Sequence, residues 1–295
     1  MEALLVIPGP ASRELGLRVA RHLKCEVIDV AFKVFPDGES YIRFNGDVRG
    51  SDVVIVQSTP PPQDSNLIRL FLLLDNAKRL GAERVIAVVP YLAYSRQDKI
   101  FLEGEAVSIN TIIKLIEASG ADYLYTFNIH SIDIMKRFTI PAYNLSAITV
   151  LAERLKHLGF SKAVSVAPDK GAVKLVEEAD KVLNGGYGWL EKHRDRVTGE
   201  IRMEAKEIDV KGKDAVVFDD IISTGGTMAE AVKILKELGA RRVYVACTHP
   251  LMLGNSESKI LNNGAEGILG TDTIPGKFSS VSVAKVIAEP LSKLG

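Results

Sequence analysis

The chain has 295 residues, of which 46% are hydrophobic and 25% are charged; this composition is typical of a globular protein, and the length suits two domains. Its 37 basic and 37 acidic residues cancel to a formal net charge of zero, which argues against a nucleic-acid partner. Apolar runs such as LFLLLDNA are short and interrupted, which argues against a membrane-spanning helix.

The start MEALLVIPGP carries an acid where a signal peptide has basic residues, and a proline and a glycine follow early. We therefore expect a cytoplasmic protein. Its two cysteines, Cys25 and Cys247, lie in apolar segments of opposite halves, where buried, reduced thiols are expected.

The first polar segment with chemical interest is VFPDGE, residues 34–39. Pro36, Asp37 and Gly38 predict a turn. Phe35 in front of it can stack on a purine, and the carboxylates of Asp37 and Glu39 can accept hydrogen bonds from an amino group of the base. The residues alone leave an ordinary turn and a base-binding loop equally open.

A second candidate, YSRQDK at residues 94–99, follows the apolar run VIAVVPYLAY. Arg96 and Lys99 suit the oxygens of a polyphosphate, and Gln97 can contact a base or a sugar. A solvated loop is an equally good interpretation of the residues alone.

Two later apolar runs lead to polar residues. YLYTFNIH ends in His130, and SVAPDKG contains Asp169, followed by Lys170 and Gly171. A single histidine at a strand end is more often structural than a ligand. An acid at the carboxyl end of a strand is a suitable partner for Mg²⁺.

The stretch NGGYGWLEKHRDRVTGEIRM is dense in charge and glycine and has no apolar periodicity. It is interpreted either as a solvated β-arm or as a mobile flap that closes over phosphates. Its charged residues include Lys192 and Arg194.

In VVFDDIISTGGT a buried-strand pattern leads to Asp219 and Asp220 and then to a loop rich in Ser, Thr and Gly. Such a loop between a strand and a helix favours an anion, because free N–H groups and the helix dipole point at it. The two acids suit the vicinal hydroxyls of a sugar. The pattern predicts a binding site for a ribose 5-phosphate unit. The alternative is a plain helix cap beside a solvated pair of acids.

Two stretches, beginning at Asp52 and at Asp214, share the order strand, polar loop, helix, LGA-x-R-V turn and strand. This indicates a duplicated α/β unit. We therefore predict two similar domains, residues 1–145 and 146–295, each a mostly parallel sheet flanked by helices. In the first copy three prolines replace the glycines; because proline has no N–H group, that loop cannot form an amide cradle.

The acidic pair followed by STGGT is similar to the signature of the type I phosphoribosyltransferase fold, and the chain as a whole resembles the ribose-phosphate pyrophosphokinase (PRPP synthase) family. The resemblance covers essentially the whole chain, in order. It is carried by VFPDGE (34–39), YSRQDK (94–99), FNIHS (127–131), SVAPDKGA (165–172) and DDIISTGGT (219–227).

The resemblance implies transfer of the β,γ-diphosphoryl group of ATP to the 1-hydroxyl of ribose 5-phosphate, giving PRPP and AMP, with Mg²⁺ as cofactor and an active site between the domains. It also implies a homo-oligomer built from dimers, which stack into hexamers in many members. The implied residues are Phe35, Asp37, Gly38, Glu39, Arg96, Gln97 and Lys99 for ATP; Arg194, Asp219, Asp220, Ser223, Thr224, Gly225, Gly226 and Thr227 for ribose 5-phosphate; His130 and Asp169 for the metal; and Lys192 and Arg194 for catalysis.

One departure concerns Ser223, where many family members have Asp; the serine keeps a hydrogen-bonding group but loses a charge. The rival interpretations are a phosphoribosyltransferase, which consumes PRPP, and a catalytically silent relative that only binds. The first needs one such domain and no adenine loop, and the second is expected to have lost Lys192, Arg194 or His130.

Overall fold

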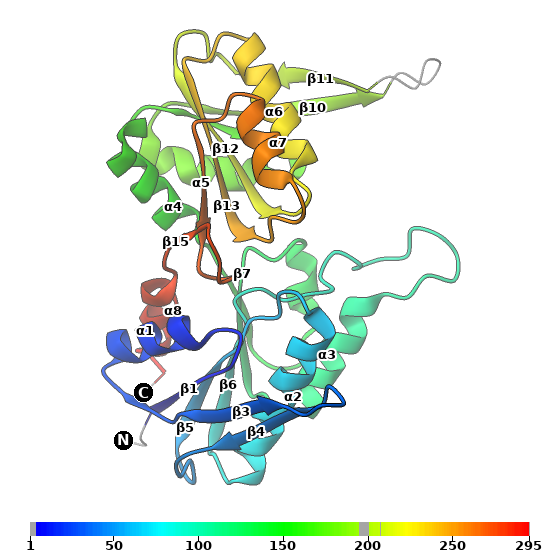
Figure 1. The fold of residues 1–295 in the computed structure, drawn as a ribbon, viewed down its shortest axis with the longest axis vertical. Helices are drawn as coiled ribbons and strands as arrows, with labels where there is room; N and C mark the ends of the chain where they lie inside the picture. The colour runs from blue at the N-terminus through cyan, green and yellow to red at the C-terminus, as the bar shows by residue number, and fades with distance from the viewer. Residues whose placement is uncertain (1–3, 195–200, 207, 295) are drawn as a thin grey trace. The chain divides into compact units, whose positions relative to one another are not determined.

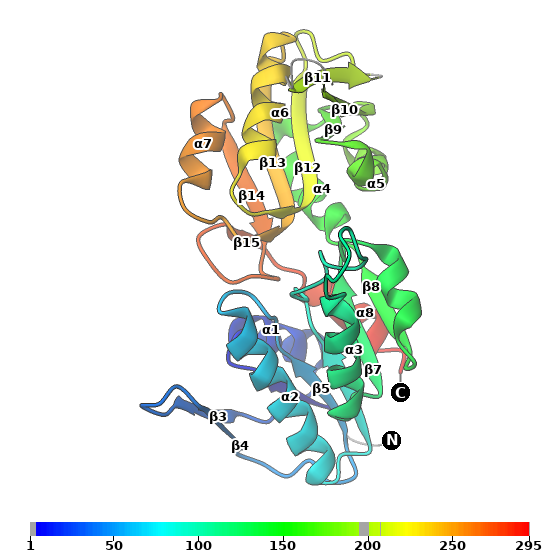
Figure 2. The ribbon, with the colours of Figure 1, turned by 90° about the vertical axis from the view of Figure 1, so that its right-hand side faces the viewer.

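The computed structural model describes residues 4–194, 201–206 and 208–294. They form two compact units, which Figures 1 and 2 show from two sides. The first unit runs to Ser146 and also includes Thr273–Pro275 and the chain from Ser282 onward. The second comprises Ala147–Asp272 and Gly276–Val281.

The first unit is built on a six-stranded parallel sheet in the order β2-β1-β5-β6-β7-β8. Its strands are β1 (Leu4–Pro8), β2 (Glu26–Val27), β5 (Asp52–Val56), β6 (Arg84–Val88), β7 (Tyr123–Phe127) and β8 (Ala142–Leu145). The central strands are buried on both faces, as their unbroken Val and Ile runs require.

Helices cover both faces of this sheet. They are α1 (Arg13–Leu23), α2 (Gln63–Arg79), α3 (Ser108–Ala118), the 3₁₀ turn η1 (Ile132–Arg137) and α8 (Ala284–Leu291). The apolar faces of α2 and α3 share one core with the sheet. On the other face α1 packs against β1, β5 and α8, and Figure 1 shows α1 and α8 side by side.

A separate antiparallel hairpin, β3 (Val30–Val34) and β4 (Ser40–Phe44), also belongs to the first unit. It pairs with no strand of the large sheet among the described residues, and in Figure 2 it projects away from that sheet. The VFPDGE segment forms its tip.

The second unit is built on a seven-stranded sheet in the order β11-β10-β9-β12-β13-β14-β15, in which β11 is antiparallel to β10 and the other pairs are parallel. Its strands are β9 (Val164–Ala167), β10 (Tyr187–Arg194), β11 (Ile201–Lys206), β12 (Asp214–Ile222), β13 (Arg242–Pro250), β14 (Gly267–Thr271) and β15 (Ser279–Val281). In Figure 1 the β10–β11 hairpin extends beyond the rest of its sheet.

The second sheet is also covered on both faces, by α4 and α5 on one and by α6 and α7 on the other. The helical segments are α4 (Ile148–Leu155), the π-turn η2 (Lys156–Phe160), the 3₁₀ turn η3 (Lys170–Ala172), α5 (Val173–Leu183), α6 (Gly226–Glu237) and α7 (Ser256–Asn262). Two mostly parallel sheets flanked by helices confirm the predicted fold class.

The sequence repeat corresponds to two structurally equivalent β-α-β units, β5-α2-β6 and β12-α6-β13. In each, the acid that opens the first strand lies opposite an arginine that opens the second: Asp52 pairs in register with Arg84, and Asp214 with Arg242. Arg84 and Asp52 form a salt bridge, with 2.7 Å from Nε to Oδ1. The duplication therefore extends to an ion pair with a buried carboxylate at the start of each unit.

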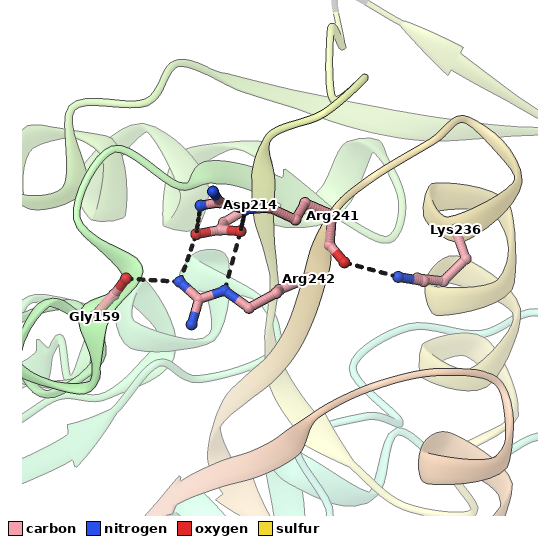
Figure 3. A network of polar contacts seen from close by, with 5 residues as sticks. All are labelled: Gly159, Asp214, Lys236, Arg241 and Arg242. Carbon is pink, nitrogen blue, oxygen red and sulfur yellow. Dashed lines mark hydrogen bonds and ion pairs between the residues drawn. The ribbon is translucent and has the colours of Figure 1, made fainter.

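The second copy of this ion pair, drawn in Figure 3, involves two arginines instead of one. The Asp214 carboxylate, 4% exposed, accepts hydrogen bonds from both Arg241 and Arg242, at 2.6–3.1 Å. Arg242 also donates to the carbonyl of Gly159 at 2.8 Å, and Lys236 donates to the carbonyl of Arg241 at 3.0 Å. Hydrogen bonds from Arg241 and Arg242 hold the pKa of Asp214 far below its usual value.

The predicted division of the chain into two domains, residues 1–145 and 146–295, stays a prediction. The two compact units part at nearly the same place, but α8 packs with the first unit. Within the described residues, no helix is long and apolar enough to cross a membrane.

Candidate functional site

The STGGT loop lies where the sequence places it, between the end of β12 and the start of α6. Gly225 caps the helix with a left-handed backbone (φ 76°), and Gly226 is the first helical residue. Because the first turn of a helix has N–H groups without intrahelical partners, its positive end faces the loop. The local backbone is therefore that of an anion-binding turn.

Glycine at position 225 is required for two reasons. The first is its positive φ; the second is that a Cβ there would lie 3.0 Å from both Cβ and the carbonyl oxygen of Ser256. At Gly226 a Cβ would meet nothing within 4 Å, so the space beside it is open. The N–H of Leu253 donates to the carbonyl of Ser223 at 2.9 Å, which holds the loop from behind.

Asp219 and Asp220 lie inside β12, which continues to Ile222. The sequence interpretation ended the strand at the acids; the strand is longer because β13 pairs with it as far as Pro250. Desolvation, followed by the charge of Asp220 and a hydrogen bond with it, raises the pKa of Asp219, and the charge of Asp169 adds to this. Two crowded carboxyl groups make this a place where a cation or hydroxyl groups are favoured.

Asp169 follows β9 by two residues, and its side chain caps η3 by accepting from the N–H of Gly171 at 2.8 Å. It is exposed, and its charge acts on Asp219. The structure therefore brings Asp169 and the acidic pair together, at the carboxyl ends of neighbouring parallel strands.

His130 lies in the first unit, three residues beyond the end of β7, and is exposed. Among the described residues, no group of three or more His, Cys, Asp or Glu side chains is arranged to hold a metal. The donors still fit Mg²⁺ in kind: carboxylate oxygens are its preferred protein ligands, and it is usually bound through one or two of them together with substrate phosphates. Desolvation and the neighbouring charges of Asp220 and Asp169 raise the pKa of Asp219, and a divalent cation at this place would favour the ionised carboxylate.

The VFPDGE segment forms the predicted turn. The N–H of Gly38 donates to the carbonyl of Phe35 at 2.9 Å, and the N–H of Phe35 donates to the carbonyl of Glu39 at 2.8 Å. Phe35 is exposed, lies edge-on to Tyr41 with ring centroids 6.0 Å apart, and has the ammonium group of Lys33 4.5 Å from its centroid. The hairpin tip therefore presents an aromatic ring to solvent beside the carboxylates of Asp37 and Glu39.

Arg96, Gln97 and Lys99 lie in the long connection from β6 to α3. Arg96 and Lys99 are exposed, and Gln97 is half-buried. The ammonium group of Lys99 lies 5.2 Å from the centroid of the Phe101 ring. Two cations thus face solvent on one short segment.

Lys192 and Arg194 both fall in β10, opposite Met203 and Ile201 of β11. The backbone is a β-arm, which is one of the two interpretations of the sequence, and the flap stays a prediction. The side chains of both residues lie outside the described part of the structure.

Sequence reasoning missed the residues that hold these segments. Glu105 and Arg137 anchor the 96–99 segment, and Lys259 reaches the carbonyl of Thr224 at 3.4 Å. None belongs to a motif, so no local signal distinguishes them from ordinary surface charges. The sequence predicts that the loop of the first copy cannot form an amide cradle. In the structure, its residues Gln57 and Ser58 are fully buried and hydrogen-bonded within the first unit.

Two protein-family models match the chain. The model for the N-terminal domain of ribose phosphate pyrophosphokinase matches residues 4–120, and the phosphoribosyl transferase domain model matches residues 139–262. The first covers the hairpin tip and the 96–99 segment, and the second covers Asp169, the β10–β11 hairpin and the STGGT loop.

Curated relatives match over nearly the full length. The chain is 41% identical to the ribose-phosphate pyrophosphokinase of Methanobrevibacter smithii, over 97% of this chain and 99% of the relative, and 41% identical to that of Methanopyrus kandleri, over 99% of both. Among solved structures, phosphoribosylpyrophosphate synthetase from Mycobacterium smegmatis matches with a TM-score of 0.88 and 30% identity, over 99% of both chains.

Proposed function

Since the chain belongs to the ribose-phosphate pyrophosphokinase family, we propose that it transfers the β,γ-diphosphoryl group of ATP to the 1-hydroxyl of ribose 5-phosphate, releasing AMP. The single observation that carries the proposal is the turn between β12 and α6, where an acidic pair precedes a left-handed glycine at a helix start. It joins a place for a phosphate to a place for sugar hydroxyls in one short segment. Because both substrates are intracellular metabolites, a cytoplasmic location is part of this proposal.

Ribose 5-phosphate binds through the second unit in this proposal. Its phosphate accepts hydrogen bonds from the loop formed by Ser223, Thr224, Gly225, Gly226 and Thr227, where the open space beside Gly226 leaves room for an oxygen. Asp219 and Asp220 accept hydrogen bonds from the 2- and 3-hydroxyls. Ser223 supplies a donor rather than a charge at the edge of the loop.

ATP binds through the first unit. The adenine stacks on Phe35, whose other surroundings are Lys33 and Tyr41, while Asp37, Gly38 and Glu39 line the turn beside it. Stacking on an aromatic ring contributes about 1–3 kcal/mol per base. Arg96, Gln97 and Lys99 bind the polyphosphate and the nucleoside.

Mg²⁺ supplies charge neutralisation and orientation of the diphosphoryl group when it is bound; His130 and Asp169 would hold it. Lys192 and Arg194 bring further positive charge to the phosphates and exclude water from them. Phosphoryl-type transfer needs positioning and charge stabilisation rather than a covalent nucleophile, so no residue is assigned as one. The 1-hydroxyl attacks the β-phosphorus in line with the departing oxygen of AMP.

The test is a product analysis with purified chain, MgATP and ribose 5-phosphate, in which AMP and ADP are separated by chromatography. We expect AMP in equal amount to PRPP, and its formation only when ribose 5-phosphate is present. A phosphoribosyltransferase would instead consume PRPP with a base, and a silent relative would release no AMP. Production of ADP would show an ordinary kinase and refute the proposal.

We also propose a homo-oligomer built from dimers, with the β3–β4 hairpin at the contact. Apolar side chains of the hairpin and of the neighbouring α2 are exposed, namely Phe32, Val34, Ile68 and Leu72. Arg69 links the two elements, since its guanidinium carbon lies 4.7 Å from the centroid of Phe32 and its Nε donates to Ser40 at 3.0 Å. A contact between two copies would bury this surface. Sedimentation equilibrium giving the mass of a single chain at micromolar concentration would refute it.

A further inference from the structure

The connection from β6 to α3 contains Arg96, Gln97 and Lys99 and has no helix or strand between residues 89 and 107. Its tip is exposed, including the apolar side chains of Ile100, Phe101 and Leu102. A segment of this length and exposure would ordinarily sample many conformations. Three sets of contacts nevertheless hold it: one from Arg137 outside the connection, and two from Glu105 and Tyr94 within it.

Arg137, at the end of η1, supplies the first contact. Its Nη2 donates to the carbonyl oxygen of Asp98 at 2.8 Å, across 39 positions of the sequence, and its Nη1 donates to Oδ1 of Asn110 in α3 at 2.9 Å. The guanidinium is planar and donates hydrogen bonds to both partners. It therefore fixes the Asp98–Lys99 peptide unit relative to α3.

Glu105 supplies the second contact. One of its carboxylate oxygens accepts from the N–H of Phe101 at 2.8 Å and from the N–H of Leu102 at 3.0 Å, and it lies 3.4 Å from the side-chain nitrogen of Gln97. The backbone hydrogen bonds from Leu102 and Phe101 lower the pKa of Glu105, so the carboxylate is charged at neutral pH. It closes the far side of the segment into a compact turn.

Tyr94 supplies the third. Its backbone is left-handed (φ 67°), an uncommon conformation for a residue with a side chain, and its hydroxyl donates to the carboxylate of Asp64 in the first turn of α2. The N–H of Gln97 donates to the carbonyl of Tyr94 at 3.3 Å. The chain therefore enters the 96–99 segment in a fixed direction.

We propose that Arg137, together with Glu105, is a positioning residue that holds the 96–99 segment in the conformation that receives the polyphosphate of ATP. The inference rests on the proposed function, because it takes the ATP role of Arg96, Gln97 and Lys99 from there. Arg137 bonds a backbone carbonyl rather than the ligand, so it acts through the segment.

The physical gain is preorganisation. Ordering a flexible segment on binding costs conformational entropy for each immobilised side chain, in addition to that of its backbone. When Arg137 and Glu105 have already fixed the backbone, this cost does not reduce the affinity for ATP. Loss of either contact should therefore weaken ATP binding and leave ribose 5-phosphate binding unchanged.

The experiment compares Arg137→Ala, Arg137→Lys and Glu105→Ala with a matched control, Lys136→Ala. Lys136 is the adjacent cation; it is exposed and forms a salt bridge with Asp133 within η1, so its removal changes the net charge by the same amount. MgATP binding is measured by calorimetry without ribose 5-phosphate, and KM for both substrates is measured where turnover occurs.

We expect Arg137→Ala to weaken MgATP binding and raise its KM roughly tenfold, which corresponds to about 1.4 kcal/mol. KM for ribose 5-phosphate should stay within about twofold of the unmodified chain. Arg137→Lys should recover part of the loss because one donor can still reach the carbonyl of Asp98, and Glu105→Ala should act in the same direction as Arg137→Ala.

Unchanged MgATP binding in Arg137→Ala and Glu105→Ala, or an equal loss for both substrates, would overturn the positioning role. Because calorimetry needs no turnover, that result is distinct from a failure of the proposed function, in which the unmodified chain would make no PRPP. If Arg137→Ala does not fold, as judged by its melting temperature, the MgATP affinities of Arg137→Lys and Glu105→Ala still test the positioning role.

Discussion

Asp219 and Asp220 are neighbours in one strand, and the pKa of Asp219 is raised by desolvation and, after it, by the charge of Asp220. Such crowding is unfavourable in a protein that gains nothing from it. In the proposed function both carboxylates accept hydrogen bonds from the hydroxyls of the sugar. The free-energy cost of holding two carboxyl groups close together is then offset only when substrate or metal is bound.

A prediction follows at the residue scale. Asp219→Asn and Asp220→Asn should each raise KM for ribose 5-phosphate by roughly tenfold or more, because a hydrogen bond to a charged group contributes about 1.5–3 kcal/mol. KM for ATP should change far less, since the sugar alone presents hydroxyls to this loop. Steady-state kinetics with each substrate varied in turn measures both values. Equal effects on the two substrates would assign the acids to metal binding or to the fold.

At the scale of elements, β12 combines structure and function in one strand. Its first residue, Asp214, is buried and bonded to Arg241 and Arg242, and its second half carries the acidic pair. The two ends are linked through the register of β12 with β13, which starts at Arg242. The ion pair thus fixes the strand whose other end presents the acids.

This arrangement predicts a pH-dependent stability. The pKa of Asp214 is lowered in the folded chain, whereas an unfolded Asp has a pKa of about 3.9. Its stabilising effect is therefore complete above the unfolded value and is lost as the pH falls through the folded value.

Asp214→Asn should lower the free energy of unfolding by about 1.5–3 kcal/mol at pH 7, as expected when a buried carboxylate loses its charged hydrogen bonds. The difference from the unmodified chain should shrink when the pH is lowered to 3. Urea unfolding at the two pH values measures it. The control is Asp209→Asn, which removes an exposed pair with Lys213 and should leave the urea midpoint unchanged. A destabilisation that is the same at both pH values would contradict the electrostatic explanation.

The elements that the sequence predicted well are those with strong local patterns. The Val- and Ile-rich runs of β5 and β12, the STGGT turn and the turn at Gly38 follow from periodicity and turn chemistry, which act over a few residues. The return of α8 to α1 was missed because an amphipathic helix does not indicate which distant face will cover it. Arg137 was missed for the same reason: its bond to Asp98 depends on the fold and not on a motif.

One signal in the sequence went unused. Asp52 and Asp214 open the two repeats, and Arg84 and Arg242 occupy equivalent positions after the LGA turns. Since the first residues of two adjacent parallel strands lie at the same edge of a sheet, this spacing could have predicted both ion pairs. Glu83 in the first copy, where the second has Arg241, also explains why only the second carboxylate has two arginine partners.

At the scale of the whole molecule, duplication was followed by a division of roles. The second copy keeps the glycine loop at the start of α6, while in the first copy the corresponding residues are buried and tied to their own unit, with Ser58 donating to the carbonyl of Thr273. The first unit instead has the β3–β4 hairpin and the anchored 94–105 segment. We propose that one half now binds ribose 5-phosphate and the other binds ATP.

The central claim is that the diphosphoryl group moves intact through attack on the β-phosphorus, and an isotope experiment tests it most directly. The chain is supplied with ribose 5-phosphate, Mg²⁺ and ATP that carries oxygen-18 in the bridge between the α- and β-phosphorus, and the products are analysed by mass spectrometry. The account predicts that all of the label leaves with AMP and that PRPP contains none. Label in a diphosphate product, or ADP in place of AMP, would contradict it.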